Sequence, residues 1–140
     1  MILLDTNVVS EPIRRRPDRR VLDWLDAQAI ETLYFSTISL AELLLGVESL
    51  PVGRRRTALA AALERQIAEL FGDRITPFDI AAAEAYAKVV ARARSQRHPI
   101  SIADGQIAGI AAAKKFCIAS RDELPFHAAG LVVINPWTAE

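Results

Sequence analysis

The sequence predicts an α/β domain in which helices cover both faces of a central parallel sheet, and two observations support this fold class. Short apolar segments alternate along the chain with longer segments of helical spacing, a pattern that requires right-handed crossovers between parallel strands. The 140 residues suffice for one such domain, and no repeat or linker divides them. We therefore expect a single domain over residues 1–140, with ligands bound beyond the carboxyl ends of the strands.

The first expected strand is Ile2 to Leu4, a continuous apolar run of the kind that is covered on both faces of a parallel sheet. Asp5 ends this strand. Asp18 can cap a helix that carries several large apolar residues up to Leu25. A second strand is expected at Leu33 to Phe35, because its residues favour extended structure.

The middle of the chain predicts two helices and a short strand. Ser39 to Glu42 has a capping-box pattern and is expected to open a helix that Pro51 stops. Arg54 to Phe71 has the length and spacing of a long helix, and Gly72 is a typical residue to end it. A brief strand is expected at Arg74 to Thr76.

The last third predicts two further helices and two strands. Asp79 can cap an alanine-rich helix that runs to about Arg97. Ser101 to Asp104 repeats the capping-box pattern and precedes a helix that ends at two lysines, where basic residues are favourable. The two expected strands are Phe116 to Ala119 and Leu131 to Ile134.

Four acidic residues from separate parts of the chain are expected at the carboxyl edge of this sheet. Two follow strands and two lie in the first turns of helices: Asp5 and Asp122, and Glu42 and Asp104. Like charges brought together raise one another's pKa, so their convergence indicates a cation. Oxygen ligands suit Mg²⁺ or Mn²⁺ and not zinc. Mg²⁺ keeps water molecules that can attack a phosphodiester, so the pattern predicts a metal-dependent hydrolytic site.

Each acid also has a purely structural interpretation. Asp5 and Asp122 could cap turns after their strands. Glu42 and Asp104 could be ordinary capping-box acids that bind the backbone at the start of their helices. A single acid therefore decides little, whereas four acids at strand ends and first helical turns favour a site.

Four motifs in order resemble those of PIN-domain nucleases, and most of all the VapC/FitB-type toxins of bacterial toxin–antitoxin pairs. They are Met1 to Pro12, Ser39 to Val47, Ile102 to Ala108, and Ala119 to Asp122 with the ending Asn135 to Trp137. The resemblance covers essentially the whole chain. It implies a three-layer PIN-like fold and a metal-dependent endoribonuclease that uses Mg²⁺, with Mn²⁺ as a substitute.

The resemblance also implies roles for individual residues. Asp5, Glu42 and Asp104 match the three firm acidic positions of the family. Asp122 matches a fourth position where relatives tolerate Asn, so its bond to metal could run through water. Three polar residues could orient the carboxylates from outside the ligand set, although each equally suits a turn: Thr6, Asn7 and Ser120.

The resemblance implies a small antitoxin partner of ribbon–helix–helix or similar DNA-binding type, an RNA substrate, and contact with operator DNA only through the antitoxin. Arg14, Arg15 and Arg16 follow the Asp5 loop and could hold RNA phosphates, with a solvated turn as the alternative. We also expect a homodimer, because the hydrophobic fraction of 51% is high and Leu40 to Leu50 has an apolar face.

Composition excludes several other classes of protein. A net charge of zero argues against a protein that coats nucleic acid. No apolar run approaches the roughly 18 residues of a membrane span, and the start lacks a basic leader, so we expect a cytoplasmic protein. A receiver-like signalling domain would need adjacent acids after the first strand, whereas Asp5 stands alone. The remaining alternative is a non-catalytic module of the same fold that binds RNA or protein.

Overall fold

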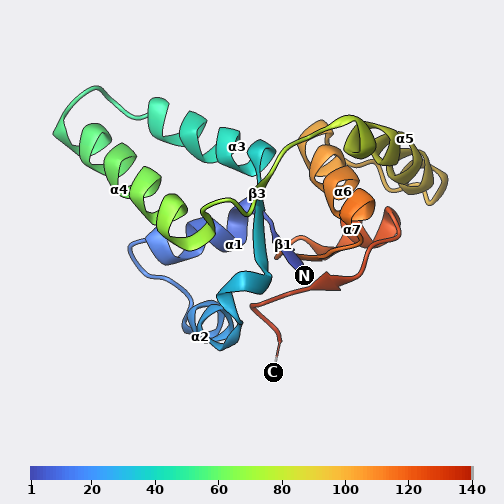
Figure 1. The fold of residues 1–140 in the computed structure, drawn as a ribbon, viewed down its shortest axis with the longest axis horizontal. Helices are drawn as coiled ribbons and strands as arrows, with labels where there is room; N and C mark the ends of the chain where they lie inside the picture. The colour runs from blue at the N-terminus through green and yellow to red at the C-terminus, as the bar shows by residue number, and fades with distance from the viewer. Residues whose placement is uncertain (140) are drawn as a thin grey trace.

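A computed structural model describes residues 1–139 and contains a five-stranded, all-parallel sheet with helices on both faces (Figure 1). The strand order is β3-β2-β1-β4-β5. The strands are β1 (Ile2–Leu4), β2 (Leu33–Ser36), β3 (Ile75–Thr76), β4 (Cys117–Ala119) and β5 (Val133–Ile134). The predicted fold class and all five predicted strands are confirmed.

Seven α-helices connect and flank these strands within residues 1–139. They are α1 (Thr6–Ser10), α2 (Arg19–Ala27), α3 (Thr37–Glu48), α4 (Arg54–Phe71), α5 (Ile80–Ser95), α6 (Ile102–Lys114) and α7 (Glu123–Ala128), with short 3₁₀ helices η1 (Glu11–Ile13) and η2 (Ile30–Thr32). Figure 1 shows α3 and α4 side by side, extending away from the sheet, with α5, α6 and α7 on the other side of the molecule.

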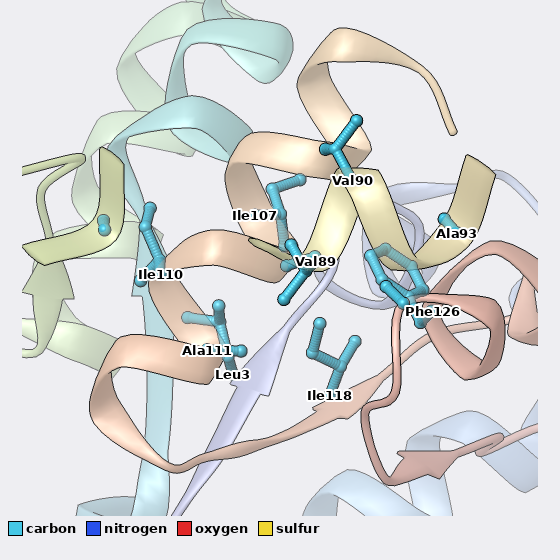
Figure 2. Close-up of a cluster of buried hydrophobic side chains, with 12 residues drawn as sticks. Leu3, Val89, Val90, Ala93, Ile107, Ile110, Ala111, Ile118 and Phe126 are labelled. Atoms are coloured by element: carbon cyan, nitrogen blue, oxygen red, sulfur yellow. The ribbon is translucent and has the colours of Figure 1, made fainter. Parts of the chain in front are cut away.

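Neighbouring residues of the central strands point into two different cores. Leu3 and Ile118 pack with α5, α6 and α7 (Figure 2), whereas Leu4 and Ala119 pack with α1, α2, α3 and α4. This alternation is the ordinary consequence of the two-residue period of a strand. It explains why the strands are apolar on both faces and places their carboxyl ends at one edge.

Most predicted helix starts are confirmed at their caps. The side chains of Asp18, Asp79 and Ser101 each accept a hydrogen bond from a backbone N–H in the first turn of α2, α5 and α6. At the end of α4, Gly72 has φ +53°, a left-handed conformation that favours glycine. The long helix predicted at Arg54 to Phe71 is also confirmed, with the same bounds.

The predicted start of α3 is wrong by one turn. Ser36, and not Ser39, is the N-cap, and its hydroxyl accepts a hydrogen bond from the Ser39 N–H at 3.0 Å. Ser39 is buried inside the helix. Glu42 therefore lies in the second turn of α3, beyond reach of a capping-box role.

The sequence analysis missed α1, η1, η2 and α7. Each is six residues or shorter, too short to display the helical period of apolar residues. α1 forms because Asp5 caps it and because Val8 and Val9 are buried against the second core. Tertiary packing therefore stabilises this turn.

Both tryptophans have packing roles, since Trp137 is buried and Trp24 packs against the second core. In α3, Leu44 and Leu45 are exposed, and the homodimer stays a prediction. Within residues 1–139, no helix is both long and apolar enough to span a membrane.

Two glycines let α6 approach α5 closely. A Cβ atom at Gly109 would lie 2.7 Å from the carbonyl oxygen of Ala82, and one at Gly105 would lie 2.9 Å from side-chain atoms of Tyr86 and Val90. No such atoms are that close in relaxed structures, so a larger residue would push the helices apart. Because Asp104 precedes Gly105, this contact also sets the position of that acid.

We predict that Gly109→Ala lowers the free energy of unfolding by about 1–3 kcal/mol, because the added methyl group meets backbone that cannot move aside cheaply. Gly46→Ala is the matched control, since among the described residues nothing lies within 4 Å of its Cβ position in α3. It should stabilise the protein by about 0.5–1 kcal/mol through helix propensity. Urea denaturation of the two variants checks both signs, and equal effects would show that the glycine contact is not needed.

Candidate acidic site at the carboxyl edge of the sheet

The four predicted acids line one cavity of about 390 Å³ at the carboxyl edge of the sheet. They come from the end of β1, from α3, from α6 and from the segment after β4. Its described lining is Asp5, Thr6, Asn7, Ser10, Glu42, Asp104 and Asp122. The structure therefore brings together acids that are up to 117 positions apart in the sequence.

The register of the sheet places Asp5 beside Ser120. Leu4 of β1 pairs with Ala119 of β4, and the Asp5 N–H donates to the Ala119 carbonyl at 2.9 Å. Ser120 and Asp5 are therefore neighbours as the strands end. The Ser120 hydroxyl donates to Oδ2 of Asp5 at 2.7 Å, while the Thr6 N–H donates to Oδ1 at 2.8 Å. Both carboxylate oxygens of Asp5 are thus oriented.

The Ser120 hydroxyl also joins the loop after β4 to α1. It accepts hydrogen bonds from the Asp122 N–H at 3.0 Å and from the side-chain amide of Asn7 at 3.3 Å. A hydroxyl has one proton to donate and two lone pairs to accept with. Because its proton goes to Asp5, all of its hydrogen-bonding capacity is used, and its orientation is fixed.

Thr6 connects Asp5 to Glu42. Its backbone N–H donates to Asp5, and its hydroxyl donates to Oε1 of Glu42 at 2.8 Å. Thr6 and Ser120 therefore contact carboxylates directly, whereas Asn7 acts through Ser120. These contacts agree with the orienting positions expected for the three residues; the catalytic consequence of that orientation stays a prediction.

Burial and mutual repulsion perturb two of the acids. Asp5 is 5% exposed, and burial raises its pKa to about 6; hydrogen bonds from Ser120 and Thr6 oppose this shift, and the charges of Asp104 and Glu42 add to it. The pKa of Asp104 is also raised, chiefly by burial, with the charges of Asp122 and Glu42 contributing. Asp5 and Asp104 therefore take up a proton at higher pH than ordinary aspartates do in the metal-free protein.

The site has an unbalanced negative charge. Among residues 1–139, no Lys, Arg or His nitrogen lies within 4 Å of the four carboxylates. All of its charged groups are oxygen donors, as Mg²⁺ and Mn²⁺ prefer. No three described acids are close enough to hold one ion directly. A cation that keeps several waters fits a cavity of this size with some bonds through water.

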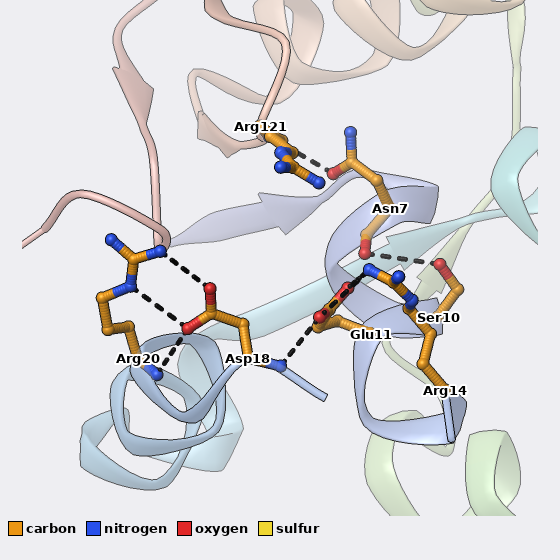
Figure 3. Close-up of polar contacts among 7 residues, drawn as sticks. All are labelled: Asn7, Ser10, Glu11, Arg14, Asp18, Arg20 and Arg121. Atoms are coloured by element: carbon orange, nitrogen blue, oxygen red, sulfur yellow. Dashed lines mark hydrogen bonds and ion pairs between the residues drawn. The ribbon is translucent and has the colours of Figure 1, made fainter. Parts of the chain in front are cut away.

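The structure does not bring the predicted arginines to the cavity. Arg14, Arg15 and Arg16 are exposed in the loop after η1 and are not among the lining residues. Arg14 instead pairs with Glu11 at 3.1 Å (Figure 3). Contact between these arginines and RNA remains a prediction.

Two residues near the site were missed in the sequence. Ser10 lines the cavity, and its hydroxyl donates to the Asn7 carbonyl at 3.3 Å. Glu11 is 3% exposed and accepts hydrogen bonds from Arg14 and from the Asp18 N–H at 2.8 Å. Figure 3 shows how Glu11, the first residue of η1, thereby ties the end of α1 to the start of α2. Only recognition of α1 and η1 as helical turns would have placed Ser10 and Glu11 in space.

Comparison with known proteins identifies relatives along the entire chain. The PIN domain family matches residues 2–130. Plasmid stability protein StbB of Pseudomonas syringae pv. tomato is 52% identical, with 99% of this chain and 100% of that protein covered. VapC ribonuclease Y4jK of Sinorhizobium fredii is 49% identical, covering 98% of each chain. Toxin FitB of Neisseria gonorrhoeae is 45% identical over 98% of this chain and 99% of its own.

Two solved structures have the same fold. The crystal structure of FitAcB from Neisseria gonorrhoeae superposes with a TM-score of 0.94 at 45% identity, covering 99% of this chain and 100% of that one. The structure of FitAB bound to an IR36 DNA fragment gives a TM-score of 0.95 at 44% identity, covering 100% and 98%. The PIN-like architecture expected from the sequence is thereby confirmed.

We predict that metal-free protein becomes less stable as pH rises from about 5 to about 8, by roughly 1 kcal/mol from Asp5 alone. The ordinary pKa of the carboxyl is 3.8, which applies to the unfolded chain, whereas in the folded chain it is about 6. The folded state therefore binds more protons between these values, and stability is lost as pH rises through about 6. Urea unfolding in EDTA at several pH values measures the slope.

Other groups titrate over the same range, so the comparison is between variants. Asp5→Asn should remove this part of the pH dependence, whereas Asp73→Asn, at an exposed residue, should keep it. The same pH slope in wild type and Asp5→Asn would contradict the raised pKa.

Proposed function

The chain belongs to the PIN-domain family, and on this premise we propose that it is the ribonuclease toxin of a toxin–antitoxin pair and cleaves RNA with Mg²⁺ or Mn²⁺. The observation that carries the proposal is the cavity in which four carboxylates meet without a basic partner in the described chain. Such an arrangement costs stability unless a cation binds to it.

The chemistry follows from the residues that hold this charge together. When bound, Mg²⁺ or Mn²⁺ supplies a water of lowered pKa and neutralises charge on the phosphodiester. Asp5, Glu42 and Asp104 would hold the ion, at least one of them through a bound water because no three described acids are close enough to bind one ion directly. Asp122 would contact it directly or through water. The hydrogen bonds from Thr6 and Ser120 keep two of these carboxylates oriented before the substrate arrives.

The orientation of the site residues lowers the entropy cost of ordering the carboxylates when the cation and the substrate bind. Asp5 cannot rotate without breaking its bonds to Thr6 and Ser120. Its burial keeps bulk water from one side of the carboxylate, while Glu42 and Asp122 are exposed at the mouth of the cavity. A phosphodiester from solvent would therefore meet the exposed acids first, with Asp5 at the inner end of the site.

Relatives support the toxin part of the proposal. One relative is named a VapC ribonuclease and another a FitB toxin, and a solved structure contains FitAB bound to DNA. By analogy, a small DNA-binding antitoxin would bind this chain and hold it inactive, with operator DNA contacted through the antitoxin alone. A homodimer would fit the exposed leucines of α3.

The two alternative functions, a receiver-like signalling domain and a non-catalytic binding module, are supported to different degrees. Membership of the PIN-domain family leaves no support for a receiver-like signalling domain. A non-catalytic module of this fold would bind RNA without cutting it. It would also gain nothing from the cluster of acids, since their repulsion has to be offset elsewhere.

We predict that Asp5→Asn, Glu42→Gln and Asp104→Asn each reduce RNA cleavage by roughly 100-fold or more, because each removes a charge that would hold the cation. Cleavage of a labelled single-stranded RNA in Mn²⁺ or Mg²⁺, and its loss in EDTA, measures this. Matched controls are Asp73→Asn and Glu69→Gln, whose side chains are exposed away from the cavity. They should cut at the wild-type rate, and full activity in EDTA would contradict the proposal.

We also predict that Mg²⁺ or Mn²⁺ raises the melting temperature more at about pH 8 than at about pH 5, because only ionised carboxylates bind the cation. Asp104→Asn should lose most of this gain, while without metal it should melt at or above the wild-type temperature, since one repelling charge is gone. Thermal melts with Asp73→Asn as control check both statements. Equal metal-induced shifts in wild type and Asp104→Asn would show that these acids do not form one cation site.

A further inference from the structure

Arg121 lies at the rim of the acidic cavity. It is exposed and stands between Ser120 and Asp122, and its backbone N–H donates to Oδ1 of Asn7 at 3.3 Å. Asn7 and Asp122 both line the cavity. Figure 3 shows Arg121 beside Asn7 at the end of α1. The backbone of Arg121 is therefore held by Asn7, which also donates to Ser120 of the site.

The guanidinium group of Arg121 is held on an aromatic ring. Its Cζ atom lies 5.3 Å from the centre of the Trp137 ring. Trp137 is 5% exposed, so its ring is held by the packing around it, and its backbone N–H donates to Oδ1 of Asn135 at 3.0 Å. A cation–π contact engages the charge of the guanidinium and leaves its N–H groups without hydrogen-bond acceptors of their own. The contact with Trp137 restricts the arginine without using those N–H donors.

The charge of Arg121 has no close acidic partner in the described chain. Among residues 1–139, no carboxylate oxygen lies within 4 Å of its nitrogens. The charge of Arg121 contributes to the lowered pKa of Asp18. That carboxylate already accepts two hydrogen bonds from the Arg20 side chain, from Nε at 3.2 Å and from Nη2 at 2.8 Å. The guanidinium of Arg121 therefore has donors that are free for a ligand, on a residue whose neighbours Ser120 and Asp122 belong to the acidic site.

We propose that Arg121, supported by Trp137, binds a phosphate of the RNA strand next to the phosphodiester in the acidic cavity. The inference rests on the proposed ribonuclease function and adds a substrate-binding residue to it. Two outward N–H groups of a guanidinium match two oxygens of a phosphate, and such charge-assisted pairs are strong. The contact would offset the repulsion that four carboxylates exert on an approaching strand.

RNA is favoured over an acidic protein segment because of where Arg121 lies. A strand whose phosphodiester occupies the cavity passes over its rim, and the adjacent phosphates are then close to residues flanking Asp122. An acidic peptide would face the same repulsion from the four acids with no group to place in the cavity. Phosphate contacts of this kind position a strand without reading its bases.

The test measures binding and cleavage separately. The probe is a short fluorescein-labelled single-stranded RNA, whose affinity is measured by anisotropy in EDTA over a series of salt concentrations. Arg121→Gln should weaken binding by roughly tenfold and should reduce the slope of log affinity against log salt by about 0.7, the value for one phosphate contact on a single strand. In Mn²⁺, its KM should rise by a similar factor, with kcat changed less than about twofold.

Two further variants separate charge, geometry and folding. Arg121→Lys keeps the charge but loses the planar fork, so it should retain the salt slope and recover only part of the affinity. Arg94→Gln removes an exposed arginine of α5 and should match wild type in affinity, slope and KM. Circular dichroism melts confirm that each variant is folded, as expected for changes at exposed residues.

The outcomes distinguish this inference from the proposed function. If wild type cuts RNA but Arg121→Gln matches Arg94→Gln in affinity, slope and KM, the role of Arg121 is wrong while the ribonuclease stands. That result, combined with weaker binding of an acidic peptide to Arg121→Gln, would assign the arginine to a protein partner. If wild type neither binds nor cuts RNA in Mn²⁺, both proposals fall.

Discussion

The hydrogen bond from Ser120 to Asp5 is the interaction on which the site depends. It joins the ends of β1 and β4, and its length of 2.7 Å is that of a strong bond to a carboxylate. A buried carboxylate without such donors would be too costly to keep in a small domain. The same hydroxyl accepts from Asn7 and Asp122, so the sheet, α1 and the segment after β4 share one hydrogen-bonded junction.

The remaining acids depend on helix packing. Asp104 is set by α6, whose glycine face lies against α5 more closely than any side chain would permit. Glu42 is set by α3, which is capped by Ser36, and its carboxylate is oriented by Thr6. Asp5 and Asp122 thus share Ser120, whereas Glu42 and Asp104 depend on α3 and α6, and all of these supports act at one edge of the sheet. The repulsion is localised at this edge, where a cation or a protonated carboxyl can relieve it.

The charges of the molecule are segregated around that edge. The cavity is anionic, while Arg121 is held against Trp137 at its rim. Because acidic and basic residues are equal in number, the net charge of zero gives no sign of this local separation of charge. A local positive group beside a negative site can orient a polyanion, whereas a positive charge spread over the surface would bind it in many positions. The domain therefore has no need of the large basic surface of a general nucleic-acid-binding protein.

The amino-acid sequence by itself determined the fold class, the five strands and the four acids, because apolar period, cap residues and strand ends are local properties of the chain. It could not determine α1, whose five residues are helical through burial of Val8 and Val9, nor that Ser36 caps α3 in place of Ser39. Only the tertiary structure decided that Leu4 pairs with Ala119, the register that brings Ser120 to Asp5. It also decided the partners of two arginines: Arg121 contacts Trp137, and Arg14 pairs with Glu11. Those contacts depend on strand register and on side chains far apart in the sequence, and no local pattern encodes the distance between them.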